Sequence, residues 1–164
     1  PDSVGMDGAL LCTIAARLEQ RATAVHSIIV IRHGRLVFEQ YFPGYDQPWG
    51  QPEGQHEFTA TTRHDMRSAS KSVTSLLVGI AIDRKLIAGV DEPVLKFFSD
   101  YAAVKQPGWD AITLRHLLTM SAGIKWDEAR AWTDPKNDEP HLVVEPDPLG
   151  YVLSRPVVAP PDTL

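Results

Sequence analysis

The residue pair best suited to covalent chemistry is Ser68 and Lys71, which lie three positions apart. If a helix begins near Ser68, residues three apart share one face and their side chains can touch. A serine hydroxyl is a poor nucleophile at neutral pH, but a lysine can activate it where burial lowers the lysine pKa. The N-terminus of a helix also favours the negative charge that develops during nucleophilic attack. The pair therefore predicts a nucleophilic serine with a lysine that assists proton transfer.

A purely structural role explains the same pair. Ser and Lys are common, and roughly 0.5 chance matches to this spacing are expected in a chain of this length. On spacing alone, Ser68 would be a helix N-cap and Lys71 a solvated lysine. The next apolar residues, however, cover most of a helical surface: Val73, Leu76, Leu77, Val78, Ile80 and Ile82. Such a helix is expected to be buried, and a lysine in its first turn then needs partners, a lowered pKa, or both.

The other candidate residues have weaker patterns. Ser70 and Ser72 lack the three-residue relation to the lysine, so we interpret them as structural. His116 lies in an apolar segment, which favours a hydrogen-bonded packing residue over a catalytic base. Trp126 and Asp127 follow that segment and could form the rim of a substrate cleft, although an ordinary loop position is the simpler interpretation.

The sequence gives no indication of a metal ion or a cofactor. The other histidines are scattered and match no metal-ligand spacing: His26, His33, His56, His64 and His141. No glycine-rich phosphate motif is present. The single cysteine, Cys12, cannot form an internal disulfide, and its place beside an apolar helical stripe predicts a packing role.

The composition is that of a globular protein. A chain of 164 residues with 43% apolar and 23% charged residues can bury a substantial core. The net charge of −5, without a basic patch, disfavours nucleic acid and anionic membranes as partners. No run reaches about 18 consecutive apolar residues, so we expect no transmembrane helix. No signal peptide is recognisable, which leaves a cytoplasmic, periplasmic or secreted location open.

Periodicity and turn residues place the elements. Asp7 is expected to cap a helix that extends to Arg21, and Gly34 to allow a hairpin turn. We expect a loop over residues 43–55 and, from Trp126 onwards, a proline-rich segment with few regular elements. The other expected elements are strands Ser27–Ile31 and Leu36–Phe42, a possible strand Phe58–Thr62, helices Ser68–Lys85 and Ile112–Met120, the latter with Thr113 as N-cap, and short pieces at Val94–Phe98 and Tyr151–Ser154.

This order predicts an α+β fold in which the few strands precede a mostly helical half. Two or three strands make a poor sheet unless other strands or helices pack against them. The last residues, 160–164, do not resemble a finishing element. We therefore expect this sequence to contain only part of its fold.

Several motifs together resemble one superfamily. The run RSASKSVTS, residues 67–75, is similar to the active-site helix of serine β-lactamases and penicillin-binding proteins. It most resembles the branch of class C β-lactamases, family VIII-type esterases, D-aminopeptidases and 6-aminohexanoate-dimer (nylon-oligomer) hydrolases. The run ITLRHLLTMSAGI, residues 112–124, resembles a helix of that branch, and the hairpin at His33 and Gly34 and the run VAPP, residues 158–161, fit the same order.

The resemblance implies a β-lactamase/transpeptidase-like fold, with an antiparallel sheet flanked by helices and a mostly helical lobe. Residues 1–67 would begin the α/β lobe, and residues 68–164 would form much of the helical lobe with the active-site helix. Two further family motifs, Tyr-x-Asn (or Tyr-x-Ser) and Lys-Thr-Gly (or His-x-Gly), are not present; Tyr151 is followed by Val152 and Leu153. The resemblance therefore implies that the rest of the sheet, and these motifs, belong to a further segment or a second chain.

The resemblance also implies the chemistry. Ser68 would form an acyl-enzyme with an ester or amide, and Lys71 would accept or relay its proton. We favour a carboxylesterase or small-amide hydrolase. The alternatives are a true β-lactamase, a D-amino-acid peptidase, a non-catalytic binding protein with this fold, and a small helical interaction domain that matches by coincidence. The expected partner is a small ester, amide or β-lactam, and the source is expected to be bacterial.

Overall fold

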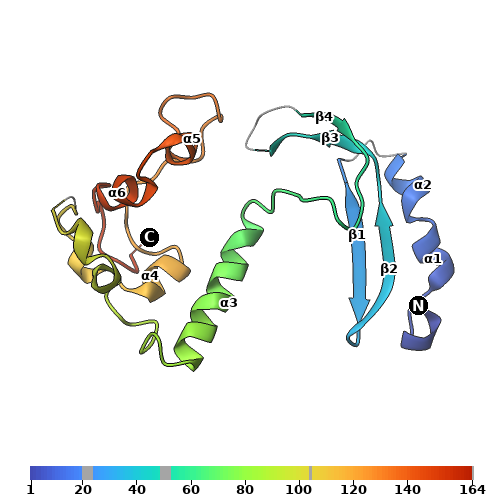
Figure 1. The fold of residues 1–164 in the computed structure, drawn as a ribbon, viewed down its shortest axis with the longest axis horizontal. Coiled ribbons are helices and arrows are strands. Elements are labelled where there is room, and N and C mark those ends of the chain that lie inside the picture. Colours follow the sequence, from blue (N-terminus) through green and yellow to red (C-terminus); the bar gives the residue numbers. More distant parts are fainter. Residues whose placement is uncertain (20–23, 49–52, 104, 164) are drawn as a thin grey trace. The chain divides into compact units, whose positions relative to one another are not determined.

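The computed structural model describes residues 1–19, 24–48, 53–103 and 105–163. These residues form two compact units, Pro1–Met66 and Arg67–Leu164, which we describe separately. Helices and small antiparallel sheets make up the two units, in agreement with the predicted α+β class (Figure 1). None of the described helices is both long and apolar enough to cross a membrane.

Among its described residues, the first unit contains three short helices followed by two β-hairpins. Its elements are η1 (Asp2–Val4), α1 (Gly8–Cys12), α2 (Ile14–Glu19), β1 (Ser27–Arg32), β2 (Arg35–Tyr41), β3 (Gly44–Asp46) and β4 (Gly54–His56). Asp7 caps α1 as predicted, because its carboxylate accepts a hydrogen bond from the Leu10 amide at 2.9 Å. The predicted single helix is divided at Thr13, and its expected end at Arg21 lies outside the described residues. Cys12 is exposed, so its predicted packing role is wrong for the described residues.

The predicted hairpin is confirmed. β1 and β2 pair in antiparallel register from Ser27 opposite Tyr41 to Arg32 opposite Arg35 (Figure 1). The two turn residues, His33 and Gly34, both have positive φ, at 50° and 71°. Two consecutive left-handed residues give the turn a twist that matches the strands, which is why glycine is favoured there.

Two predictions in the next segment are wrong. Residues 43–55 were expected to form a loop, but β3 and β4 form a second hairpin with Tyr45 opposite Gln55. Their glycine content concealed these three-residue strands. Residues 58–62 were expected to form a strand, but they form a turn in which the Thr59 amide donates to Thr62 Oγ1 at 3.0 Å. Threonine side chains often compete in this way with strand pairing.

The second unit is mostly helical. Its elements are α3 (Ala69–Asp83), η3 (Val94–Phe97), η4 (Ser99–Tyr101), η5 (Trp109–Ala111), α4 (Leu114–Leu118), α5 (Asp138–Val144) and α6 (Pro148–Leu153). The predicted helices near α3, α4 and α6 are therefore confirmed, with Thr113 as the N-cap of α4. Helix α5 was missed because it lies in the proline-rich part of the chain, where Asn137 caps it through the Glu139 amide.

The core of the second unit forms around Trp109. The fully or nearly fully buried apolar residues are Val94, Trp109, Ile112, Ala122 and Leu153. The Trp109 indole N–H donates to the Arg155 carbonyl at 3.0 Å, so its one polar group is satisfied. This core joins the segment around η3 and η5 to α6.

Helix α3 does not have the burial that its sequence predicts. No residue of α3 is buried, and the exposed fraction of Leu76 reaches 64%. The physical reason is that the core of this unit uses residues from 94 onwards, and no other described element of this unit covers the apolar surface of α3. The sequence prediction of a buried helix is therefore wrong for the described residues.

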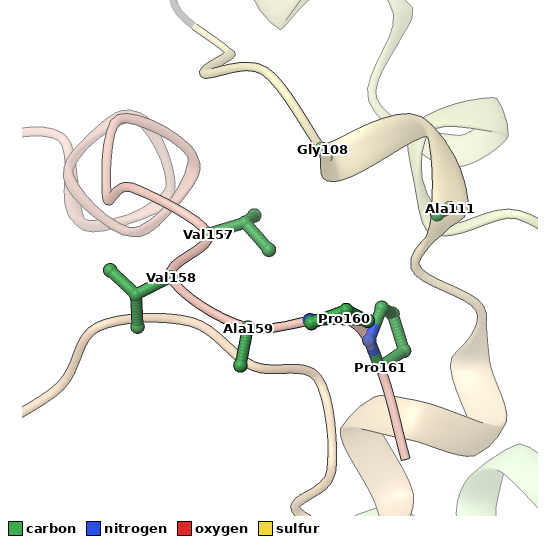
Figure 2. A pocket seen from close by; sticks show the side chains of 7 residues that line it. All are labelled: Gly108, Ala111, Val157, Val158, Ala159, Pro160 and Pro161. Carbon is green, nitrogen blue, oxygen red and sulfur yellow. The ribbon is translucent and has the colours of Figure 1, made fainter. Parts of the chain in front are cut away.

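Two glycines allow close packing near the end of the described chain. Gly108 and residues 157–161 line an open apolar groove of about 370 Å³ (Figure 2). A Cβ on Gly108 would lie 2.9 Å from the Val157 Cβ. Gly123 has φ of 70°, and a Cβ there would lie 2.1 Å from the Ala159 carbonyl oxygen. The groove lining contains no nucleophile and no charged side chain, so it offers no catalytic chemistry.

We expect Gly123→Ala to destabilise the protein by about 2–4 kcal/mol, because it adds a left-handed alanine to a steric overlap with backbone. Gly89→Ala is the matched control, since Gly89 does not have positive φ and its Cβ would meet no atom within 4 Å. We expect this control to change stability by less than about 1 kcal/mol. Denaturant unfolding of both variants of the full-length protein measures the difference. Equal stabilities would contradict this account of Gly123.

Candidate active site

Ser68 and Lys71 lie together at the start of α3. Ser68 occupies the N-cap position, but its side chain makes no capping hydrogen bond. Instead its Oγ accepts a hydrogen bond from Lys71 Nζ at 3.3 Å. Both residues are exposed, so the burial that we expected for Lys71 is absent among the described residues. The hydroxyl is thus held by the lysine and not by the backbone of the helix.

The backbone immediately before Ser68 is in a sparsely populated conformation. Arg67 has φ of 46°, in the left-handed region that disfavours residues with a Cβ. Such a residue costs on the order of 1–3 kcal/mol and is typically retained at functional sites. The chain then tightens, since the amides of Ser70 and Lys71 donate to the carbonyls of Arg67 and Ser68, each at 3.0 Å. The guanidinium of Arg67 also lies 5.9 Å from the centre of the Trp132 ring.

The predicted rim residues, Trp126 and Asp127, have structural contacts of their own. The Trp126 indole donates to Glu128 Oε2 at 3.1 Å, and its ring lies edge-on to Tyr151. Asp127 Oδ2 accepts a hydrogen bond from Arg130 Nε at 2.5 Å. This bond from Arg130 is the main reason that the pKa of Asp127 is lowered. Among the described residues, Trp126 and Asp127 form these contacts with neighbours other than Ser68 and Lys71, and a role at the rim stays a prediction.

His116 is a hydrogen-bonded packing residue, as predicted. Its Nδ1 accepts a hydrogen bond from the Thr113 amide at 3.1 Å, and its Nε2 lies 3.3 Å from Asp162 Oδ2. The hydroxyl of Ser121 donates to the other oxygen of Asp162 at 2.6 Å. The Ser121 bond, followed by the positive potential at His116, lowers the pKa of Asp162. This network fixes the start of α4 against residue 162.

Sequence reasoning missed a buried carboxylate, Asp138. Its oxygens accept hydrogen bonds from the Tyr151 hydroxyl at 2.9 Å and the Asp127 amide at 2.8 Å, and Arg155 lies at 2.7 Å. Burial, followed by the bond to Asp138, raises the pKa of Tyr151. The buried carboxylate of Asp138 is therefore satisfied by these three donors, and we assign this cluster a structural role.

The histidines are less scattered than the sequence indicates. His26 and His64 lie side by side, and Asp46 completes a group of three potential metal ligands. The sequence could not reveal this group, because its members come from three different segments of the first unit.

Comparisons with known proteins bear on the whole chain. A family model described as Beta-lactamase matches residues 13–164. An uncharacterized protein from Alkalihalophilus pseudofirmus is 28% identical over 102 residues, which cover 60% of this chain and 27% of that protein. The chain therefore spans only part of the length of this relative. Because the family model covers most of its residues, the chain belongs to the β-lactamase family, within the serine β-lactamase and penicillin-binding-protein superfamily of serine hydrolases.

Proposed function

We propose that the complete protein is a serine hydrolase that forms an acyl-enzyme on Ser68 during hydrolysis of a small ester or amide. The observation that carries the proposal is the hydrogen bond from Lys71 Nζ to Ser68 Oγ at 3.3 Å, beside a residue in left-handed conformation. An ordinary N-cap serine would instead accept a hydrogen bond from the first turn of its own helix. Membership of a family of serine hydrolases supports the same role.

The proposed reaction begins when Ser68 Oγ attacks the substrate carbonyl carbon. A neutral Lys71 accepts the hydroxyl proton, and the carbonyl oxygen becomes an oxyanion that the Ser68 amide helps to stabilise. The tetrahedral intermediate collapses, and the leaving group departs with a proton returned from the lysine. Water then attacks the acyl-enzyme, which releases the acid product and restores the hydroxyl.

We further propose that additional polypeptide, from the same chain or a second one, covers α3 and extends the sheet. The apolar residues Leu76 and Leu77 of α3 are exposed, and so are Ile29 and Ile31 of β1. Residues 28–31 of β1 form a continuous apolar run, which is typical of a strand covered on both faces. Burial would bring Lys71 into the environment in which a lysine can lose its proton at neutral pH. The same polypeptide would supply the tyrosine and the second oxyanion donor expected from the family.

A carboxylesterase or small-amide hydrolase of the class C-like branch is our preferred activity, and a β-lactamase or a D-amino-acid peptidase is the alternative. Residues 1–67 would then begin the α/β lobe and residues 68–164 the helical lobe, with Trp126 and Asp127 on the rim of the cleft. A non-catalytic binding protein with this fold is the alternative from another class.

A fluorophosphonate probe and a penicillin probe distinguish an enzyme from a binding protein. We expect covalent labelling of the full-length protein at Ser68, located by mass spectrometry, and no labelling of Ser68→Ala. Ser70→Ala is the matched control and should label normally, because the hydrogen bond from Lys71 Nζ goes to Ser68 Oγ. Unlabelled wild-type protein that is folded would contradict the proposed activity.

The role of Lys71 is tested with substitutions in the full-length protein. We expect Lys71→Ala and Lys71→Arg each to lower kcat/KM for p-nitrophenyl acetate by about 10²–10⁴-fold, since neither side chain can accept a proton. In the Ser68→Ala/Lys71→Ala double variant, the decrease in kcat/KM should be smaller than the product of the two single decreases, because the two groups act as a unit. Near-normal activity of Lys71→Arg would show that another group is the base.

Residues 1–164 expressed alone should be inactive toward the same ester, because apolar side chains of α3 and β1 are exposed and the Tyr-x-Asn and Lys-Thr-Gly motifs of the family are absent from these residues. Adding the remaining polypeptide in trans should restore activity if the two parts fold together. If residues 1–164 alone hydrolyse the ester and Ser68→Ala abolishes this activity, the additional polypeptide is not required for catalysis.

A further inference from the structure

Three side chains of the first unit gather around one point. His26 precedes β1, Asp46 is the last residue of β3, and His64 follows β4. Each offers one ligand atom, and these atoms all lie within 4.8 Å of one another. We propose that His26, Asp46 and His64 form a binding site for a divalent transition-metal ion, with Zn²⁺ as the best match.

The hydrogen bonding of His64 leaves the lone pair of Nε2, the nitrogen that faces His26, available for a metal. Its Nδ1 lies 3.2 Å from the backbone carbonyl of Asp65. A carbonyl oxygen only accepts, so in a neutral ring this contact places the proton on Nδ1 and the free lone pair on Nε2. Metal-binding histidines are commonly oriented by such a bond from the other ring nitrogen. His64 is exposed, so an ion can reach the site from solvent.

The ring of His26 is held in place by packing. It stacks on the buried Phe58 with the ring centres 4.0 Å apart and the planes 8° from parallel. Gly44 also lies against the ring, since a Cβ there would be 2.8 Å from His26 Cδ2. The His26 Nε2 is buried and has no hydrogen-bond partner among the described residues. Packing therefore fixes the ring, and Nδ1 is the nitrogen that faces His64.

The two rings approach closely. His26 Nδ1 and His64 Nε2 are 2.5 Å apart. Two nitrogens bound to one tetrahedral Zn²⁺ at about 2.0–2.1 Å would be roughly 3.3 Å apart. A modest rotation of the exposed His64 ring would open this gap. The ion would then take the place of the proton between the rings, and neutral His26 would carry its single ring proton on Nε2.

Asp46 supplies the third ligand and a negative charge. Its Oδ1 accepts a hydrogen bond from the Gln47 amide at 2.8 Å, and a carboxylate has further lone pairs available. Two imidazole nitrogens and one carboxylate oxygen suit Zn²⁺ and its transition-metal neighbours better than Mg²⁺ or Ca²⁺, which prefer oxygen ligands. Three protein ligands leave a fourth tetrahedral position for water. The bound ion would link the segment before β1, the end of β3 and the segment after β4.

Zinc titration of the metal-free, full-length protein against a chromophoric chelator tests the site. The protein carries Cys12→Ser, because the exposed thiol could bind the metal itself. We expect the parent protein to bind one Zn²⁺ per chain. In His64→Gln and in Asp46→Asn, we expect the affinity for Zn²⁺ to fall at least about 10–100-fold or binding to be lost. His56→Gln is the matched control and should leave the affinity unchanged, since its Nε2 contacts the Glu53 carbonyl and lies outside the group.

A second measurement uses the parent protein without a ligand substitution. Zn²⁺ should slow modification of His64 by diethyl pyrocarbonate, read by mass spectrometry, and should not protect the exposed His33. Protection of His64 supports the site even if a substituted protein fails to fold. The proposal is overturned if Zn²⁺ gives no protection of His64, or if folded His64→Gln and Asp46→Asn both bind Zn²⁺ as the parent does. In either case the two histidines only share a hydrogen bond.

Discussion

The first turn of α3 is the constraint on which the proposed chemistry depends. Arg67 adopts a left-handed backbone, and the tight turn that follows places Ser68 at the helix start without using its hydroxyl as a cap. The hydroxyl therefore accepts its hydrogen bond from Lys71. A relaxed, normally capped turn would engage the same oxygen with the backbone and remove it from chemistry. Local backbone geometry thus leaves the Ser68 hydroxyl free of a capping bond, as the proposed nucleophilic role requires.

The second unit is stabilised independently of that turn. Trp109 and its neighbours form an apolar core, while Asp138 is satisfied by Tyr151, Arg155 and a backbone amide. Gly123 permits the backbone of residue 159 to approach more closely than a side chain would allow. These contacts hold α6 and the proline-rich segment in place, but none of them covers α3. The stability of this unit and the proposed chemistry of Ser68 therefore depend on different parts of it.

The two candidate sites differ in the kind of organisation they need. Ser68 and Lys71 are neighbours on one helix, so three residues of sequence suffice to bring them together. His26, Asp46 and His64 meet only because two hairpins return the chain to the same place and Phe58 supports one ring. The first arrangement is local and the second is entirely tertiary.

The sequence by itself determined the features with short-range causes. These include the Ser68–Lys71 pair, the Asp7 and Thr113 helix caps, the turn at His33 and Gly34, and the family to which the chain belongs. Each follows from residue types a few positions apart, where the backbone leaves few alternatives. Only the tertiary structure decided the second hairpin, the burial of Asp138, the exposure of α3 and the meeting of His26 with His64. Those features depend on which distant segments pack together, and no local periodicity encodes that choice.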